Sequence, residues 1–185
     1  YTELDKAGMK FFSGYWGYEE DSLEETIEWN QRKLEADFNL GFTEHCSHDY
    51  KQVVYKLSGY SEVRGFWMNN YPEDGEFTYE IIIPESDVLA KGYPVSFKEE
   101  SIEELLGFSK RVWQFPPVRA IQTGLEIEDD SASLAELAQG GCPNAWPFAI
   151  VEELGACHED SVYDIQPISK GKKGVLFWRT GTDNE

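Results

Sequence analysis

The chain has 185 residues, of which 41% are hydrophobic and 15% aromatic, and its formal net charge is −19 at pH 7. This length and composition exclude an intrinsically disordered chain and are typical of a folded protein with a sizeable core. The charge disfavours direct binding to nucleic acid or to an anionic membrane, and it favours cationic ligands or basic protein partners, although a charge of this size also serves solubility alone.

The number of cysteines argues against a disulfide framework. There are three, Cys46, Cys142 and Cys157, and a sparse, odd set is typical of a reducing compartment. No apolar run approaches the roughly 20 residues that a membrane-spanning helix needs, and no signal peptide is visible. These features predict a cytoplasmic protein.

The first predicted elements are a strand over residues 9–16 and the helix that follows it. The strand carries aromatic side chains on both faces, which favours a place in the interior of a sheet. Ser22 and Glu25 form a capping box that starts the helix. The apolar residues of this helix share one face, which predicts a buried stripe: Leu23, Ile27, Leu34 and Phe38. Trp29 lies off that stripe.

A hairpin dominates the middle of the chain. After a polar loop over 41–49 and a short strand over 52–57, residues 62–69 and 76–84 are rich in β-branched and aromatic side chains. The intervening residues 72–75, Pro-Glu-Asp-Gly, are typical of a turn. Alternation places Tyr79 on one face of the second strand and Glu80 on the other.

The second half begins with a helix that Ser101 and Glu104 are expected to cap, and Pro116-Pro117 ends it. The pattern then predicts a strand over 118–127, a solvated acidic turn at 128–130, a short helix over 133–139 and a hairpin of residues 162–168 and 174–180. Residues 142–155 are apolar, but two prolines interrupt them and the pattern assigns no element there.

Together these elements predict an α+β fold of two antiparallel sheet modules packed with about three helices. The first module, residues 1–97, has the order β-α-β-β. The second, residues 98–185, begins with the 101–113 helix and then repeats that order less regularly. This duplication rests on element order alone, and the two modules are expected to form one compact domain.

Several short pieces of the first half resemble the GyrI-like effector-binding domains, which occur alone or attached to bacterial transcription regulators. These pieces are the strand over 9–16 leading to Ile27-Glu28-Trp29, the segment Gly65-Phe66-Trp67 and the segment 75–81. The resemblance implies two pseudo-repeated modules with a ligand cleft between them. It also implies binding of small molecules, often lipophilic cations, by aromatic walls and a buried carboxylate.

The residues themselves offer candidates for such a site, because aromatic rings and a carboxylate in a poorly hydrated cleft attract a cation. The candidate rings are Trp29, Trp67 and Tyr79, and the candidate acids are Glu80 and Asp164. The alternative for each residue is structural, with the rings in the core and the acids in solvent.

Two loops contain residue types that bind zinc, at Glu44–Asp49 and at Cys157–Asp160. Neither has the two-cysteine spacing of a structural zinc site, so we expect polar loops and neither a metal nor a cofactor. The chain also lacks a phosphate-binding glycine loop, a nucleophile elbow and a His-Glu-x-x-His motif. We therefore expect a non-catalytic protein.

Two functions remain open from the sequence. The first is a small-molecule binding module for a hydrophobic or cationic ligand, with a role in regulation. The second is an acidic inhibitor of a basic protein partner, as toxin-immunity proteins and DNA-mimic proteins are.

Overall fold

A computed structural model describes residues 1–40, 50–71, 76–125, 131–152 and 163–179. These residues form five α-helices and two four-stranded antiparallel sheets, which confirms the predicted α+β fold. The chain divides into two compact units, unit 1 over Tyr1–Asp87 and unit 2 over Val88–Glu185, so the division falls earlier than residue 97.

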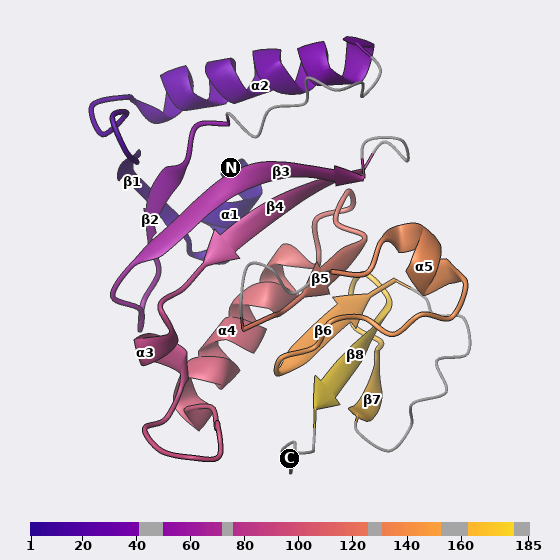
Figure 1. The fold of residues 1–185 in the computed structure, drawn as a ribbon. Coiled ribbons are helices and arrows are strands. Elements are labelled where there is room, and N and C mark those ends of the chain that lie inside the picture. Colours follow the sequence, from indigo (N-terminus) through magenta and orange to yellow (C-terminus); the bar gives the residue numbers. More distant parts are fainter. Residues whose placement is uncertain (41–49, 72–75, 126–130, 153–162, 180–185) are drawn as a thin grey trace. The chain divides into compact units, whose positions relative to one another are not determined.

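Unit 1 is a four-stranded sheet of strand order β1-β2-β3-β4, and α2 lies along one of its faces (Figure 1). Its elements in chain order are α1 (Thr2–Ala7), β1 (Lys10–Gly14), α2 (Leu23–Leu40), β2 (Val53–Lys56), β3 (Val63–Tyr71), β4 (Glu76–Ile82) and α3 (Glu85–Val88), the last of which reaches the boundary of the unit.

The prediction that the first strand lies in the interior of a sheet is wrong. β1 is an edge strand that pairs only with β2 within the described sheet, and Phe12 is 57% exposed. The Lys56 ammonium lies over the Phe12 ring at 4.0 Å from its centroid, so one ring face meets a cation instead of the core. The strand ends at Gly14, before Trp16, which has a φ of 46° that is incompatible with a continuing strand.

Helix α2 begins as predicted, but the most deeply buried of its described side chains are polar. The Ser22 hydroxyl accepts a hydrogen bond from the Glu25 N–H, and the Glu25 carboxylate accepts one from the Ser22 N–H, which completes the capping box. Thr26 and Asn30 are 0% and 1% exposed, whereas Leu23, Ile27 and Leu34 of the predicted stripe are only partly buried. Hydrogen bonding therefore contributes to how α2 attaches to its unit.

The predicted central hairpin is confirmed as β3 and β4, whose register pairs Trp67 with Tyr79 and Phe66 with Glu80. Since neighbouring residues alternate, these two pairs lie on opposite faces of the sheet. The helix face is the one that points toward α2, and it carries Val53, Tyr55, Val63, Gly65, Trp67, Tyr79 and Ile81. The Glu80 face is the opposite one, and it carries Val54, Lys56, Arg64, Phe66, Met68, Thr78, Glu80 and Ile82.

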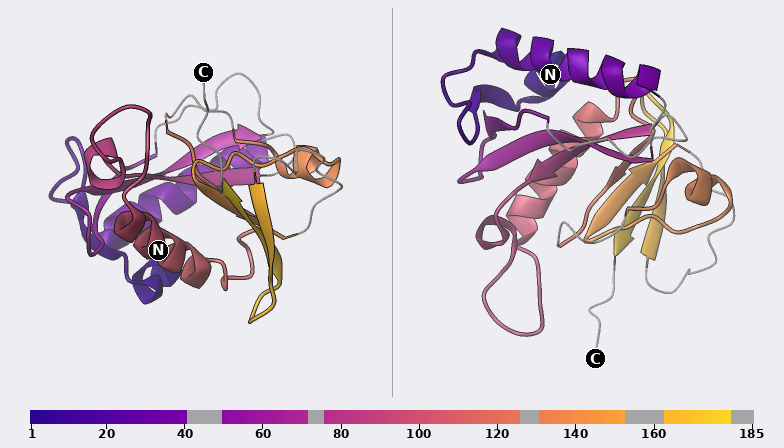
Figure 2. Two further views of the ribbon diagram at one scale, coloured as in Figure 1. Left: turned by 90° about the horizontal axis from the view of Figure 1, so that it is seen from below. Right: turned by 45° about the horizontal axis from the view of Figure 1, so that its top comes forward.

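Unit 2 contains the second sheet, with strand order β5-β6-β8-β7. Its elements are α4 (Glu99–Val112), β5 (Ala120–Gln122), α5 (Leu134–Ala138), β6 (Phe148–Val151), β7 (Tyr163–Ile168) and β8 (Gly174–Arg179). The predicted terminal hairpin is confirmed as β7 and β8. β8 lies between β6 and β7, so the strand order of unit 1 is not repeated (Figure 2).

Strand β6 lies within the segment to which the sequence assigned no element. All four of its residues are buried. Phe148 and Ile150 pack with Ile102 and Trp113 from α4 and its end, and Ala149 and Val151 pack with Leu137 of α5 on the other face. A strand covered on both faces has no polar alternation, which is why the pattern did not reveal it.

Two further boundaries in unit 2 differ from the prediction. Helix α4 begins after Lys98, and no side chain caps it, so the expected start at Ser101 is wrong. Glu99 and Glu100 extend the helix upstream because acidic residues interact favourably with the first turn. β5 covers only three residues of the longer strand expected over 118–127, of which residues 126–127 lie outside the described part.

Cys142 is disulfide-bonded, although the sequence predicts no disulfide framework and a reducing compartment. Its partner is Cys46 or Cys157, since the chain has no other cysteine, and both lie outside the described residues. Disulfides persist mainly in oxidising compartments, so the cysteine content no longer supports a cytoplasmic location.

We expect a thiol titration to reveal this bond directly. The unfolded, unreduced protein should react with one equivalent of a thiol reagent, and the same protein after reduction with three, because one disulfide hides two of the three cysteines. A Cys142→Ser variant should show two reactive thiols without reduction. Three reactive thiols in the unreduced wild type would contradict the assignment.

Some predicted features fall outside the described residues: the loop over 41–49, the turn over 72–75 and the acidic turn over 128–130. Within the described part of the chain, no helix is both long enough and apolar enough to cross a bilayer.

Candidate functional site

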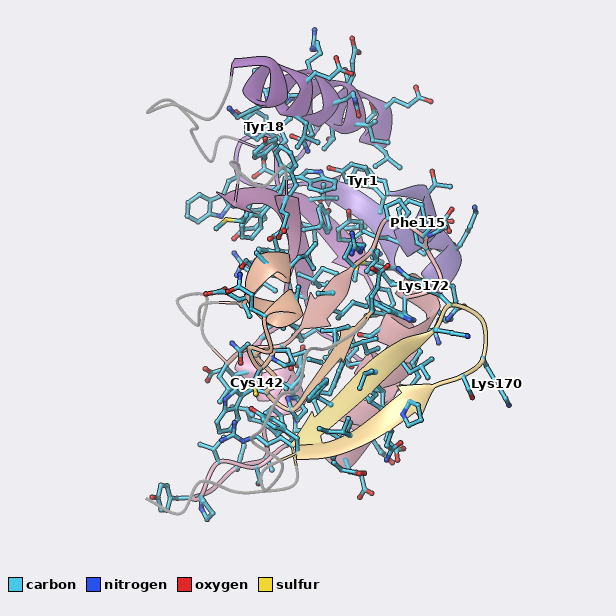
Figure 3. All side chains as sticks on the ribbon, turned by 90° about the vertical axis from the view of Figure 1, so that its right-hand side faces the viewer. Tyr1, Tyr18, Phe115, Cys142, Lys170 and Lys172 are labelled. Atoms are coloured by element: carbon cyan, nitrogen blue, oxygen red, sulfur yellow. The ribbon has the colours of Figure 1, made fainter. Side chains whose placement is uncertain are left out.

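The helix face of unit 1 carries a cluster of aromatic hydroxyls. The Tyr55 and Tyr79 hydroxyls are hydrogen-bonded to each other, and the Tyr79 ring meets Trp67 edge to face at 4.9 Å between centroids. Tyr1, which is labelled in Figure 3, contacts Tyr79 in the same way at 5.9 Å, and its hydroxyl accepts a hydrogen bond of 2.8 Å from the Asn30 amide. The structure thus brings together two predicted site residues, Trp67 and Tyr79.

Gly65 makes this packing possible. A Cβ at this position would lie 2.7 Å from the Tyr79 hydroxyl and 2.8 Å from the Tyr55 ring. Only a residue without a side chain lets the two tyrosine rings cross the strand there.

The tyrosines of this cluster are neutral hydrogen-bonding groups. Burial raises the pKa of Tyr55, and it raises the pKa of Tyr79 well above its ordinary value. The neighbouring Tyr55 and Tyr1 hydroxyls raise the pKa of Tyr79 further. A tyrosine whose pKa lies above 10 keeps its proton at physiological pH. The cluster can therefore orient a polar group, but it supplies neither a base nor a negative charge.

Three buried polar atoms of unit 1 lack a hydrogen-bond partner among the described residues: Thr26 Oγ1, Gln52 Oε1 and Trp67 Nε1. The Trp67 indole faces the Tyr1 hydroxyl without reaching the geometry of a full hydrogen bond. An unsatisfied buried group costs about 1–3 kcal/mol. The interior of unit 1 is thus more polar than an ordinary core.

Glu80 is the predicted acid that the structure distinguishes. Its side chain is half-buried, and it makes neither a hydrogen bond nor an ion pair with any described residue. Burial raises the pKa of its carboxyl group above the ordinary value of 4.5. A carboxylate that is desolvated without a compensating partner is costly and is often found at a functional site.

The surroundings of Glu80 are largely apolar. Phe66 lies directly opposite it on β3, at the position where side chains of an antiparallel pair are about 5 Å apart. The remaining apolar residues of the Glu80 face are half-buried: Val54, Met68 and Ile82. Phe66 is not among the predicted site residues, because its pairing with Glu80 is set by the β3–β4 register and not by the alternation within one strand.

The basic residues on the Glu80 face are engaged elsewhere. Arg64 forms an ion pair with Glu62 at 3.1 Å, and its guanidinium lies 5.1 Å from the centre of the Tyr15 ring. Lys56 contacts Phe12. Neither forms an ion pair with Glu80 within the described structure, so the Glu80 charge is available to a ligand.

Trp29 contacts a cation, but that cation belongs to the chain itself. The Lys51 ammonium lies 4.9 Å from the centre of the Trp29 ring and 4.6 Å from that of Tyr18, and it forms a 2.5 Å ion pair with Asp21. Two rings and a carboxylate around an ammonium are the elements of a cation cage. Here Lys51 already occupies it.

Asp164 lies in unit 2, on edge strand β7. It is exposed and accepts a 2.6 Å hydrogen bond from Gln166 Nε2, so it lacks the desolvation that distinguishes Glu80. The same unit has an open groove of about 540 Å³ that includes Gln166, Lys110 and Lys170, and Figure 3 shows Lys170 on the β7–β8 turn.

No group of three or more possible metal ligands occurs within the described ranges. The two loops with zinc-type ligands lie outside these ranges.

Comparison with known proteins places this chain in no family. No protein-family model matches it, and neither a curated protein nor a solved structure is detectably similar to it. The resemblance to GyrI-like domains therefore stays a prediction.

Proposed function

We propose that this chain is a non-catalytic binding module for a small lipophilic cation, and that Glu80 is the charge that binds it. The observation that carries the proposal is a half-buried carboxylate with no partner among the described residues, set beside Phe66. A cationic ligand would neutralise the carboxylate, and the ring and aliphatic side chains would contact the apolar part of that ligand.

This proposal narrows the site that the sequence suggested. Trp67 and Tyr79 point to the helix face, where they pack beneath α2, so they position β3 and β4 and do not contact the ligand directly. Phe66 takes the place of the aromatic wall. Trp29 serves to bind Lys51, and Asp164 is not part of the site.

The test is cation binding by the wild type and by a Glu80→Gln variant. We expect phenyltrimethylammonium to bind the wild type, and its neutral counterpart tert-butylbenzene to bind much more weakly. Removing the carboxylate should weaken cation binding at least tenfold, because a poorly hydrated charge pair loses several kcal/mol when one partner is removed. Isothermal titration calorimetry measures both affinities.

A matched control is Glu24→Gln, which removes the same charge from an exposed position on α2 and should leave the affinity unchanged. Phe66→Leu keeps an apolar side chain but removes the ring, and we expect severalfold weaker binding. Equal affinity of the wild type and Glu80→Gln, or equal binding of the cation and its neutral counterpart, would refute the proposal.

The stability of Glu80→Gln provides an independent check. The folded protein holds the Glu80 proton more tightly than the unfolded chain does, so the free energy of unfolding of the wild type falls as the pH rises from 4.5 through the raised pKa. Glutamine removes this decrease. The variant should therefore be more stable than the wild type at pH 7, by roughly 0.5–2 kcal/mol as is common for substitutions of functional residues.

A further inference from the structure

The loop between β1 and α2 exposes an aromatic side chain that packing alone does not explain. Trp16 is 76% exposed, the highest value among the large hydrophobic residues of unit 1 whose side chains the structure describes. A tryptophan carries more apolar surface than any other side chain, and such surface in water is typical of a contact region for a partner.

The backbone holds Trp16 in this position. Its φ of 46° is the only positive value at a non-glycine residue within the described chain, and Gly17 follows with a φ of 75°. A left-handed conformation is unfavourable for a large side chain and is maintained only where the surrounding structure imposes it. The outward direction of Trp16 is therefore built into the loop.

Three contacts fix the loop. The Tyr18 carbonyl packs against Gly14 so closely that a Cβ at Gly14 would overlap it, and the same carbonyl accepts a 3.0 Å hydrogen bond from the Asp21 N–H. Tyr15 stacks on Trp16 at 5.5 Å with an interplanar angle of 26°. A rigid, exposed ring binds a partner without the entropy cost of being ordered on contact.

The other rings of this region each face a basic side chain of the chain itself. Lys51 contacts Tyr18, Lys56 contacts Phe12, and Arg64 contacts Tyr15. Trp16 has no such cation among the described residues, although indole is the ring that attracts cations best. Cation–π contacts therefore recur on the rings around Trp16, whereas the Trp16 ring has none with the described residues.

The charges near Trp16 complement a basic partner. Glu19 and Glu20 follow the loop and are exposed, and Glu24 and Glu25 begin α2. These glutamates add to the negative field of a chain whose net charge is −19. Such a field raises the rate at which a positively charged segment associates with the loop.

We infer that the loop of Tyr15, Trp16, Gly17 and Tyr18 is a docking site for a basic segment of a partner protein, with an arginine or lysine placed over the open face of Trp16. This site does not involve Glu80, so it is independent of the small-molecule site. The cage of Tyr18, Trp29 and Asp21 around Lys51 shows how rings and carboxylates of this region hold an ammonium group.

The test uses a labelled nine-residue peptide of alternating arginine and glycine, with a citrulline version as the uncharged control. At about 0.15 M salt, where attraction beyond roughly 8 Å is screened, we expect the arginine peptide to bind and the citrulline peptide not to. Fluorescence polarisation measures both. Trp16→Asn should weaken binding about threefold to tenfold, the range expected for one cation–π contact. Asparagine tolerates the left-handed backbone, so the loop keeps its shape.

Two controls complete the test. Trp16→Tyr keeps a ring and should retain most of the affinity, and Tyr93→Ala, which removes an 86% exposed ring from unit 2, should retain all of it. Unchanged binding by Trp16→Asn, or equal binding of the arginine and citrulline peptides, would overturn the inference. Binding to phosphatidylcholine vesicles in place of the peptide, lost in Trp16→Asn, would overturn it in favour of a lipid surface.

Discussion

Replacing Trp113 with alanine should lower the free energy of unfolding of unit 2 by about 3–5 kcal/mol, the usual cost of deleting a buried tryptophan side chain. Trp113 is completely buried at the end of α4, where it packs with Phe148, Ile150 and Leu176 of the second sheet. A cavity of this size collapses only in part, so most of the lost contact energy is not recovered.

The indole also holds the β7–β8 turn. Its Nε1 donates a 3.2 Å hydrogen bond to the Lys172 carbonyl, and the Lys172 ammonium lies 4.2 Å from the centre of the ring. Gly174 is so close that a Cβ there would be 2.7 Å from the ring. We therefore expect the loss of Trp113 to loosen this turn as well as the core.

Urea unfolding followed by circular dichroism measures the effect. Phe115→Ala is the matched control, since Phe115 is an aromatic residue two positions later that is 37% exposed, and it should cost under about 1 kcal/mol. Trp113→Phe keeps a ring but loses the hydrogen bond, and we expect an intermediate loss. A Trp113→Ala loss no larger than that of Phe115→Ala would show that the indole is not central to unit 2.

Replacing Asn30 with leucine should destabilise unit 1 by roughly 2–4 kcal/mol, although leucine is apolar and similar in size. Asn30 donates to the Tyr1 hydroxyl and, at 3.0 Å, to the Lys51 carbonyl, and its oxygen accepts a 2.8 Å hydrogen bond from the Lys51 N–H. Leucine would leave these groups without partners away from water, and each such group costs about 1–3 kcal/mol.

The control for Asn30 is its neighbour Gln31, which is exposed and bonds only to Glu35 among the described residues. Gln31→Leu should change the free energy of unfolding by no more than about 0.5 kcal/mol. Urea unfolding of both variants distinguishes a helix attached by hydrogen bonds from one attached by apolar contact. If Asn30→Leu were as stable as the wild type, the polar attachment of α2 would be refuted.

The sequence predicts those parts of the fold that depend on residues close to one another in the chain. The Ser22–Glu25 capping box and the β3–β4 and β7–β8 hairpins all follow from residues a few positions apart. The buried face of α2 could not be predicted in this way. Asn30 is buried because its side chain hydrogen-bonds to the backbone of Lys51, which lies 21 residues later in the chain. Strand β6 cannot be predicted from alternation, because α4 and α5 cover both of its faces and all of its residues are buried.

The candidate site was predictable only in part. Strand alternation shows that Tyr79 and Glu80 point to opposite faces. That Phe66 lies on the Glu80 face depends on the β3–β4 register, which is irregular between Met68 and Tyr71 and which alternation does not determine. Glu80 has no partner among the described residues because the Arg64 side chain pairs with Glu62 and the Lys56 side chain contacts Phe12. No sequence pattern reveals these side-chain contacts. The capture of Lys51 by Trp29 and Tyr18 likewise depends on a contact between separate segments.

In the part of the chain that the structure describes, the two sheets have four outer strands, β1, β4, β5 and β7, and each carries a feature that hinders the pairing of another chain with it. β1 has an irregular register between Phe11 and Ser13, β4 carries two glutamates, and β5 has only three residues. β7 contains Pro167, which has no N–H to offer. Unprotected outer strands are where sheets join into aggregates. The features of these outer strands therefore prevent their backbones from acting as templates for aggregation, although the protein exposes many aromatic rings.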